Sequence, residues 1–190
     1  MNWILASGSP RRRELLEMLG VPDLTIRPAT GPERATPGAG PEQTVRELSL
    51  HKAQEVAQTC APEDIIIAAD TIVYLDGAIL GKPKDHDDAV RMLTALSGRE
   101  HIVYTGVAVL RGGELRQAAE QTAVRFRALT PAEIERYIAT GEPLDKAGAY
   151  GIQGRGALFV AYLDGDYFNV MGLPLCRLGQ LLNELGVELL

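Results

Sequence analysis

The sequence contains few cysteines and few aromatic residues. Its two cysteines, Cys60 and Cys176, lie far apart in a chain of 190 residues. They lack the paired CxxC spacing that is typical of zinc sites, and two thiols make no disulfide framework. We therefore interpret both thiols as packing residues of a reduced protein, and we expect a cytoplasmic location.

A long apolar segment is also missing. The longest apolar runs, such as residues 65–69, are far too short to span a bilayer. No basic segment followed by a long apolar stretch is present, so we expect no secretory signal. Both absences argue against a membrane partner.

Positive charge is in deficit. The chain has 25 acidic and 19 basic residues, a formal net charge of −6, and only 5% aromatic residues. This balance disfavours non-specific binding to nucleic acid or to anionic lipid. A polyanionic small ligand would have to be bound by a local cluster of cations.

The rest of the composition is that of a globular protein, with 46% hydrophobic residues. We expect residues 1–190 to form a single domain of the α/β class, because strand-like and helix-like segments alternate. Long hairpins favour a mixed sheet over a doubly wound parallel one. The expected strands are residues 3–6, 24–29, 65–69, 72–75, 78–80, 101–110, 114–129, 158–163 and 167–170. The expected helices are residues 10–19, 42–58, 88–96, 130–140 and 174–185.

The first candidate site is residues 7–13, Ser-Gly-Ser-Pro-Arg-Arg-Arg. Here a strand enters a loop of small residues and then a helix, whose free amides and dipole favour an anion. Hydroxyl groups and arginines add donors that suit phosphate oxygens. The alternative is an N-capped helix with solvated arginines. The GxxxxGK[ST] pattern of a Walker loop is absent from the sequence.

Lys52 is the second candidate. On the expected helix it shares one face with Val45, Leu48 and Val56. This position predicts either an inward cation held for an anionic ligand or a lysine that snorkels out at the margin of the apolar stripe.

Asp70 is the third candidate, because it follows the apolar residues 65–69. A carboxylate at the end of a buried strand is typical of metal ligands and general bases, and the alternative is a turn-capping aspartate. Lys82 follows a hairpin centred on Asp76-Gly77, and the antiparallel strands would return it toward the level of Asp70.

The segment from Asp145 to Gly154 is rich in glycine, which suggests backbone held close to a neighbour. The Gln153 amide both donates and accepts, so it could read a base edge that offers both kinds of group. The alternative is a glycine-rich surface loop.

These segments together resemble the Maf family of nucleoside triphosphate pyrophosphatases. The matching text is residues 5–12 (LASGSPRR), 70–73 (DTIV), 81–83 (GKP), 141–154 (GEPLDKAGAYGIQG) and 172–175 (GLPL). The resemblance extends from about residue 4 to about residue 178. The combination of Arg11, Thr71 and Gln153 resembles the branch that acts on dTTP and UTP.

The resemblance implies a long twisted mixed sheet flanked by helices, with two lobes and a cleft, as in inosine triphosphate pyrophosphatases. It also implies a homodimer and a divalent cation, Mg²⁺ or Mn²⁺. The catalytic aspartate falls on Asp70, and the metal-binding acidic positions fall on Asp70 and Glu33. The phosphate-binding positions fall on Ser9, Arg11, Arg12, Lys52 and Lys82.

The expected reaction is in-line attack of water on the α-phosphorus, with pyrophosphate leaving. Asp70 would bind the metal, activate the water, or both. One rival interpretation is a non-catalytic nucleotide-sensing regulator of cell division or septum formation. Asp70 argues against it, because a carboxylate beside phosphates helps a pure binder little unless a metal intervenes. A second rival is an enzyme of the same fold that prefers deaminated purines.

Overall fold

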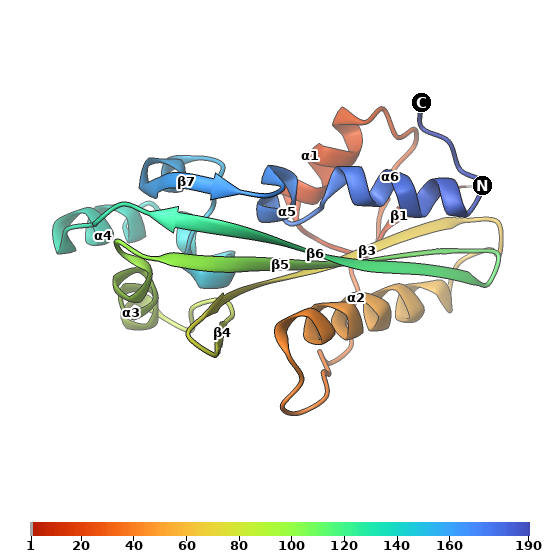
Figure 1. Ribbon diagram of the computed structural model, residues 1–190. Helices are drawn as coiled ribbons and strands as arrows, with labels where there is room; N and C mark the ends of the chain where they lie inside the picture. The colour runs from red at the N-terminus through yellow and green to blue at the C-terminus, as the bar shows by residue number, and fades with distance from the viewer. Residues whose placement is uncertain (1) are drawn as a thin grey trace. The chain divides into compact units, whose positions relative to one another are not determined.

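The structure, a computed structural model, describes residues 2–190. Over these residues the chain forms a seven-stranded sheet in the order β2-β1-β3-β5-β6-β7, with β4 paired to β3 (Figure 1). The strands are β1 (Trp3–Leu5), β2 (Thr25–Ile26), β3 (Ile65–Leu75), β4 (Ala78–Leu80), β5 (Glu100–Arg111), β6 (Glu114–Phe126) and β7 (Val160–Asp164). β1 pairs in parallel with β2 and β3, whereas β4 and β7 pair antiparallel with their neighbours, so the expected mixed sheet is confirmed.

Six α-helices and three short 3-10 helices accompany the described strands. The α-helices are α1 (Pro10–Met18), α2 (Pro41–Ala57), α3 (His86–Leu96), α4 (Pro131–Ile138), α5 (Tyr167–Met171) and α6 (Leu175–Glu184). The 3-10 helices are η1 (Glu142–Asp145), η2 (Ala147–Ala149) and η3 (Arg155–Phe159). Within residues 2–190, no helix combines the length and the apolar character needed to cross a membrane.

The chain divides into two compact units. The first unit comprises the chain up to Asp70 together with Thr105–Glu120 and Gly172–Leu190. The second unit comprises Thr71–Tyr104 and Gln121–Met171. This division agrees with the two lobes expected from the resemblance, and it assigns Asp70 and Thr71 to different units.

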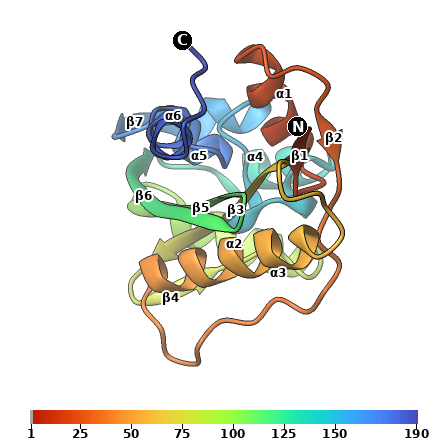
Figure 2. The same cartoon turned by 90° about the vertical axis from the view of Figure 1, so that its right-hand side faces the viewer.

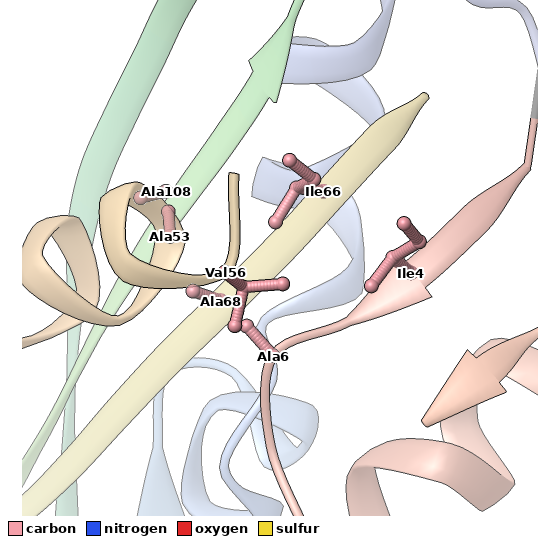
Figure 3. Packing of buried hydrophobic residues seen from close by; sticks show 7 residues of the cluster. All are labelled: Ile4, Ala6, Ala53, Val56, Ile66, Ala68 and Ala108. Atoms are coloured by element: carbon pink, nitrogen blue, oxygen red, sulfur yellow. The ribbon is translucent and has the colours of Figure 1, made fainter. Parts of the chain in front are cut away.

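In the first unit, α2 packs closely against one face of the sheet. Small residues make this approach possible, since alanines line the contact on both sides (Figure 3). The cluster consists of Ile4, Ala6, Ala53, Val56, Ile66, Ala68 and Ala108. At Gly106 the approach is closest, because a Cβ atom there would lie 2.1 Å from the carbonyl oxygen of Val45. This packing fixes α2, and with it Lys52, against the strand that carries Asp70.

The opposite face of this part of the sheet is also covered. Successive strand residues point to opposite faces, and Leu5, Ile65 and Ile67, which alternate with the cluster residues, are fully buried. Figures 1 and 2 both show α1 and α6 on this face, opposite α2. A sheet covered on both faces explains why β1 and the first half of β3 are almost wholly apolar.

The second unit has its own core. Helix α3 packs against α4 and against the short helices η1 and η2. A capping box begins α4: the Thr130 hydroxyl accepts the Glu133 N–H, and the Glu133 carboxylate accepts the Thr130 N–H. Within this core His101 is 2% exposed, and its Nε2 lies 2.7 Å from the Tyr150 hydroxyl.

Two sequence-based expectations about strands are wrong. Asp70 does not end a strand, because residues 65–69 and 72–75 belong to the single strand β3, which continues through it. The expected strand at residues 167–170 is the helix α5. The turn of α5 buries the Asn169 amide, which donates to the Val103 carbonyl and the Thr122 hydroxyl, and this long-range bonding overrides the strand-like local sequence.

Candidate active site

In the first unit, the segment from β1 into α1 holds Arg12. The buried Ser7 hydroxyl accepts a hydrogen bond from Arg12 Nη1 at 2.9 Å and one from the Ser9 N–H at 3.3 Å. Arg12 Nε donates to the Gly172 carbonyl at 2.7 Å. Burial lowers the pKa of Arg12, whereas the nearby Asp70 carboxylate opposes that shift. The guanidinium is therefore fixed by the protein before any ligand arrives.

Ser9 and Arg11 lie at the beginning of the same helix. Pro10 occupies the first helical position, as expected, but among the described residues the Ser9 side chain makes no capping hydrogen bond. The half-buried Arg11 makes no ion pair with another residue in the range 2–190. Both side chains can therefore serve a ligand at the helix N-terminus, where the dipole favours an anion.

Lys52 is the centre of the site in this unit. Its Nζ binds Asp70 Oδ1 and, at 2.8 Å, Glu33 Oε1. The Lys52 and Asp70 side chains are only 18% and 11% exposed, whereas Glu33 is 64% exposed. The Lys52 ammonium is thus largely buried and paired with two carboxylates rather than extended into solvent, and its role toward an anionic ligand stays a prediction.

The loop that carries Glu33 is tied to α2 by two carboxylates that sequence analysis missed. Glu55 accepts the Thr30 N–H at 2.7 Å and the Gly31 N–H at 3.0 Å, and Glu47 accepts the Thr36 N–H at 2.7 Å. The hydrogen bond from the Thr30 N–H is the main cause of a lowered pKa of Glu55, and the bond from the Thr36 N–H is the main cause of a lowered pKa of Glu47. Their spacing could have indicated this role, because Glu47 and Glu55 are eight residues apart and therefore lie on the same side of α2.

The charges of this cluster are unusual for an acidic chain. Three cations, Arg11, Arg12 and Lys52, accompany two carboxylates, Asp70 and Glu33, which leaves one net positive charge before a ligand binds. Arg12 interacts electrostatically with both carboxylates and with Arg11. Such a site suits a polyphosphate, whose negative charge fixed cations stabilise without reorganisation.

The donor set also fits a hard divalent cation. Asp70 and Glu33 both direct a carboxylate oxygen at the same ammonium group. Within residues 2–190, no group of three or more His, Cys, Asp or Glu side chains could hold a metal ion by itself. Mg²⁺ commonly takes one or two carboxylates and completes its shell with substrate phosphates and water. One or two carboxylates are what this unit offers.

In the second unit, Thr71 and Lys82 belong to one hairpin. Val73 pairs with Leu80, the last residue of β4, and the exposed Lys82 follows two residues later, after the pairing has ended. The intervening Gly81 carbonyl accepts the Gly148 N–H at 3.0 Å, which ties the hairpin to the glycine-rich segment. Gly148 itself has φ +68°, and a Cβ there would lie 2.7 Å from the Val73 side chain.

Gln153 lies at the exposed tip of a short loop. The glycines at its two ends, Gly151 and Gly156, are buried. The expectation that the glycines mark close backbone approach is confirmed, because a Cβ at Gly156 would lie 2.3 Å from the Gly151 carbonyl oxygen. The structure thus brings Arg11, Arg12, Glu33, Lys52 and Asp70 together in the first unit, which also holds Ser9, whereas Thr71, Lys82 and Gln153 belong to the second unit.

The fold is of the α/β class, and these groups form a cluster of cations and carboxylates near a strand–loop–helix segment, an arrangement that suits a phosphorylated ligand. The sequence profile of the family described as Maf-like protein matches residues 2–185. The chain belongs to the Maf family.

Its relatives are similar over nearly their whole lengths. The dTTP/UTP pyrophosphatase of Moorella thermoacetica is 53% identical over 187 residues, covering 97% of this chain and 95% of its own. The dTTP/UTP pyrophosphatase of Symbiobacterium thermophilum is 50% identical, covering 96% and 93%. Among solved structures, the Staphylococcus aureus Ham1 protein is 14% identical, covering 66% of this chain and 72% of its own, with a TM-score of 0.49.

Proposed function

We propose that this chain hydrolyses dTTP and UTP to the monophosphate and pyrophosphate. The relatives named for that activity are about half identical over nearly the whole chain. The structural observation that carries the proposal is the Lys52 ammonium bound to both Asp70 and Glu33 beside the fixed Arg12. This cluster combines phosphate-binding cations with the carboxylates that a hydrolytic step needs.

In the proposed reaction, the oxygen of water attacks the α-phosphorus and the bond from that phosphorus to the bridging oxygen breaks. The bonding electron pair leaves with pyrophosphate, and the water gives up a proton. Asp70 is the proposed acceptor of that proton. Ser9, Arg11, Arg12, Lys52 and Lys82 are proposed to bind the phosphate oxygens and to stabilise the charge that develops on them.

Asp70 and Glu33 are the residues proposed to hold a divalent cation, Mg²⁺ or Mn²⁺. When bound, the cation supplies Lewis-acid polarisation and neutralises phosphate charge. Selection of the base is assigned to Arg11, Thr71 and Gln153. The Gln153 amide both donates and accepts, as the adjacent O4 and N3–H of thymine or uracil require.

Pyrophosphate release from a panel of nucleoside triphosphates tests this function. We expect release from dTTP and UTP with Mg²⁺ or Mn²⁺, and none from the Asp70→Asn variant. Release from purine nucleotides alone would overturn the base assignment, and would favour an enzyme for deaminated purines if dITP or XTP is the substrate. Tight nucleotide binding without any release would favour the nucleotide-sensing regulator.

Three further properties stay predictions. The chain is predicted to form a homodimer, to be located in the cytoplasm without a nucleic-acid or membrane partner, and to form a single Maf-like domain over residues 1–190. One family profile spanning residues 2–185, and three strands that contribute residues to both compact units, support the last of these.

A further inference from the structure

The loop that carries Gln153 is tied together at its base by two side chains to which the reaction assigns no role. Tyr137, on α4, accepts the Gly151 N–H at 3.1 Å. Glu142, at the beginning of η1, accepts the Arg155 N–H and the Gly156 N–H, each at 3.1 Å. The Tyr137 hydroxyl donates to Glu142 Oε1 at 2.8 Å, so a continuous chain of hydrogen bonds joins the two ends of the loop.

The backbone around this clamp leaves no room for side chains. A Cβ at Gly156 would lie 2.8 Å from the Tyr137 hydroxyl, and one at Gly154, where φ is +88°, would lie 2.9 Å from Glu142 Oε2. A Cβ at Gly151 would lie 2.9 Å from Lys146 Cε. The glycines therefore let the loop close tightly on the two polar side chains.

The clamp is itself well supported. Tyr137 is 4% exposed, and its ring packs edge-on against Phe159 with centroids 4.8 Å apart. Partial burial opposes ionisation of Glu142, but hydrogen bonds from Tyr137 and from the Arg155 and Gly156 N–H groups outweigh burial and lower its pKa. An ionised acceptor on a buried tyrosine makes charge-assisted bonds, which hold geometry better than neutral ones.

From this arrangement we infer that Tyr137 and Glu142 are positioning residues: they fix the loop of residues 151–156 so that the Gln153 amide meets the pyrimidine base in one orientation. The inference rests on the proposed function of Gln153. A flexible glycine-rich loop would present the amide in many orientations, and a two-group match to a base tolerates little misalignment. The clamp therefore determines base selectivity without touching the substrate.

The test is the Tyr137→Phe variant, with Tyr162→Phe as its matched control. Tyr162 lies on β7 in the same unit and is 57% exposed. We expect Tyr137→Phe to lower kcat/KM for dTTP and UTP about tenfold, mostly through KM. The variant loses the hydroxyl that bonds Glu142 and Gly151, and the net strength of such hydrogen bonds corresponds to about that factor. The preference for dTTP over dCTP should fall with it, and Tyr162→Phe should leave both unchanged.

A double-mutant cycle with Gln153→Ala separates positioning from general damage. In the Gln153→Ala background, Tyr137→Phe should change the dTTP/dCTP preference less than twofold. Additive effects in the cycle, or an unchanged preference in Tyr137→Phe alone, would overturn the inference. Should Tyr137→Phe fail to fold, Glu142→Gln and Glu142→Ala replace it, with the glutamine retaining more selectivity than the alanine.

Binding of dTMP and dCMP, measured by calorimetry, distinguishes this inference from the proposed function. If no triphosphate is hydrolysed but the protein prefers dTMP and Tyr137→Phe abolishes that preference, the clamp stands and only the hydrolytic function fails. If the protein hydrolyses dTTP and the variant keeps its preference in both assays, the clamp fails and the function stands. No preference in either assay overturns both.

Discussion

Two loops of this molecule, one in each unit, are held in the same way. The loop around Glu33 begins with two consecutive N–H groups, of Thr30 and Gly31, bound to the Glu55 carboxylate. The loop around Gln153 ends with two consecutive N–H groups, of Arg155 and Gly156, bound to the Glu142 carboxylate. In both cases a carboxylate satisfies backbone donors that no helix or strand pairs.

The surroundings of the two carboxylates differ. Glu55 extends from the long helix α2, and its partners lie at the surface. Glu142 bonds in addition to the buried Tyr137 hydroxyl, and the glycines of its loop approach other backbone atoms. Because water competes for exposed hydrogen bonds, the Glu55 contacts orient their loop but add little stability. The Glu142 contacts, in contrast, are attached to a buried tyrosine of the core. The same kind of contact thus holds an exposed loop in the first unit and a loop anchored on a buried tyrosine in the second.

The largest expected effect belongs to the first unit. Asp70→Asn should lower turnover at least about a thousandfold, because the variant lacks both the proposed proton acceptor and the negative partner of Lys52. Rates of pyrophosphate release at saturating dTTP measure the loss, and circular dichroism checks that the fold is kept. The exposed Asp164→Asn variant should retain full turnover, and a variant at Asp70 with a tenth of the original rate would contradict the assignment.

As the pH falls, protonation should destabilise the second unit, through His101, at a higher pH than it weakens the Glu47 and Glu55 contacts of the first unit. Burial lowers the pKa of His101 to about 4 from 6.5. Above pH 6.5 the imidazole is neutral in both the folded and unfolded states, and between pH 6.5 and 4 only the unfolded state takes up the proton. Stability should therefore fall by up to about 3 kcal/mol as the pH drops through this window, and no further below it from this group.

Urea unfolding from pH 7 to pH 4 measures that loss. His101→Gln should show a shallower decline than the original chain across this window, and the exposed His51→Gln variant should follow the original. Glu47 and Glu55 affect stability at a lower pH. Because their pKa values are lowered in the folded state, the stability they contribute is lost only as the pH falls below about 4.5. Equal slopes for His101→Gln and His51→Gln would refute the role of His101.

A methyl group added beside each of the two carboxylates, Glu142 and Glu55, should affect the two loops differently. At Gly156 the new Cβ would lie 2.3 Å from the Gly151 carbonyl oxygen, so Gly156→Ala should destabilise the protein by about 1–3 kcal/mol. At Gly31 it would lie 2.6 Å from Glu55 Oε2, the end of a flexible side chain that can move aside. The urea midpoint of Gly31→Ala should therefore stay close to that of the original chain, and equal destabilisation by both alanines would remove the proposed difference.

The smallest expected effect comes from releasing the first loop. Glu55→Gln, which weakens the bonds to Thr30 and Gly31, should raise the Mg²⁺ concentration for half-maximal activity a few-fold, because Glu33 is then held less firmly. Its preference for dTTP over dCTP should not change. Glu142→Gln should instead alter the preference for dTTP over dCTP and leave the Mg²⁺ requirement unchanged. A variant that shifts both properties would show that the Glu55 and Glu142 contacts do not act independently.

Much of this architecture follows from local signals in the sequence. The capping box at Thr130, the apolar stripe of α2 and the turn at Asp76-Gly77 each predict an element that the structure contains. The errors fall where distant partners override local preference. Asn169 lies in a helix, where its side chain bonds Val103 and Thr122, and β3 continues through Asp70, whose carboxylate binds Lys52 on α2.

The chemical groups of this protein and the segments that carry them follow from the amino-acid sequence, because capping, turn formation and helical periodicity act over a few residues. Its ordered motifs also sufficed to indicate the family. Which of these groups come into contact depends on tertiary packing. Lys52 reaches Asp70 across 18 residues, and Glu142 reaches Gly156 across 14. Such contacts depend on how helices pack on a sheet and how loops close, and spacing along the chain does not specify either.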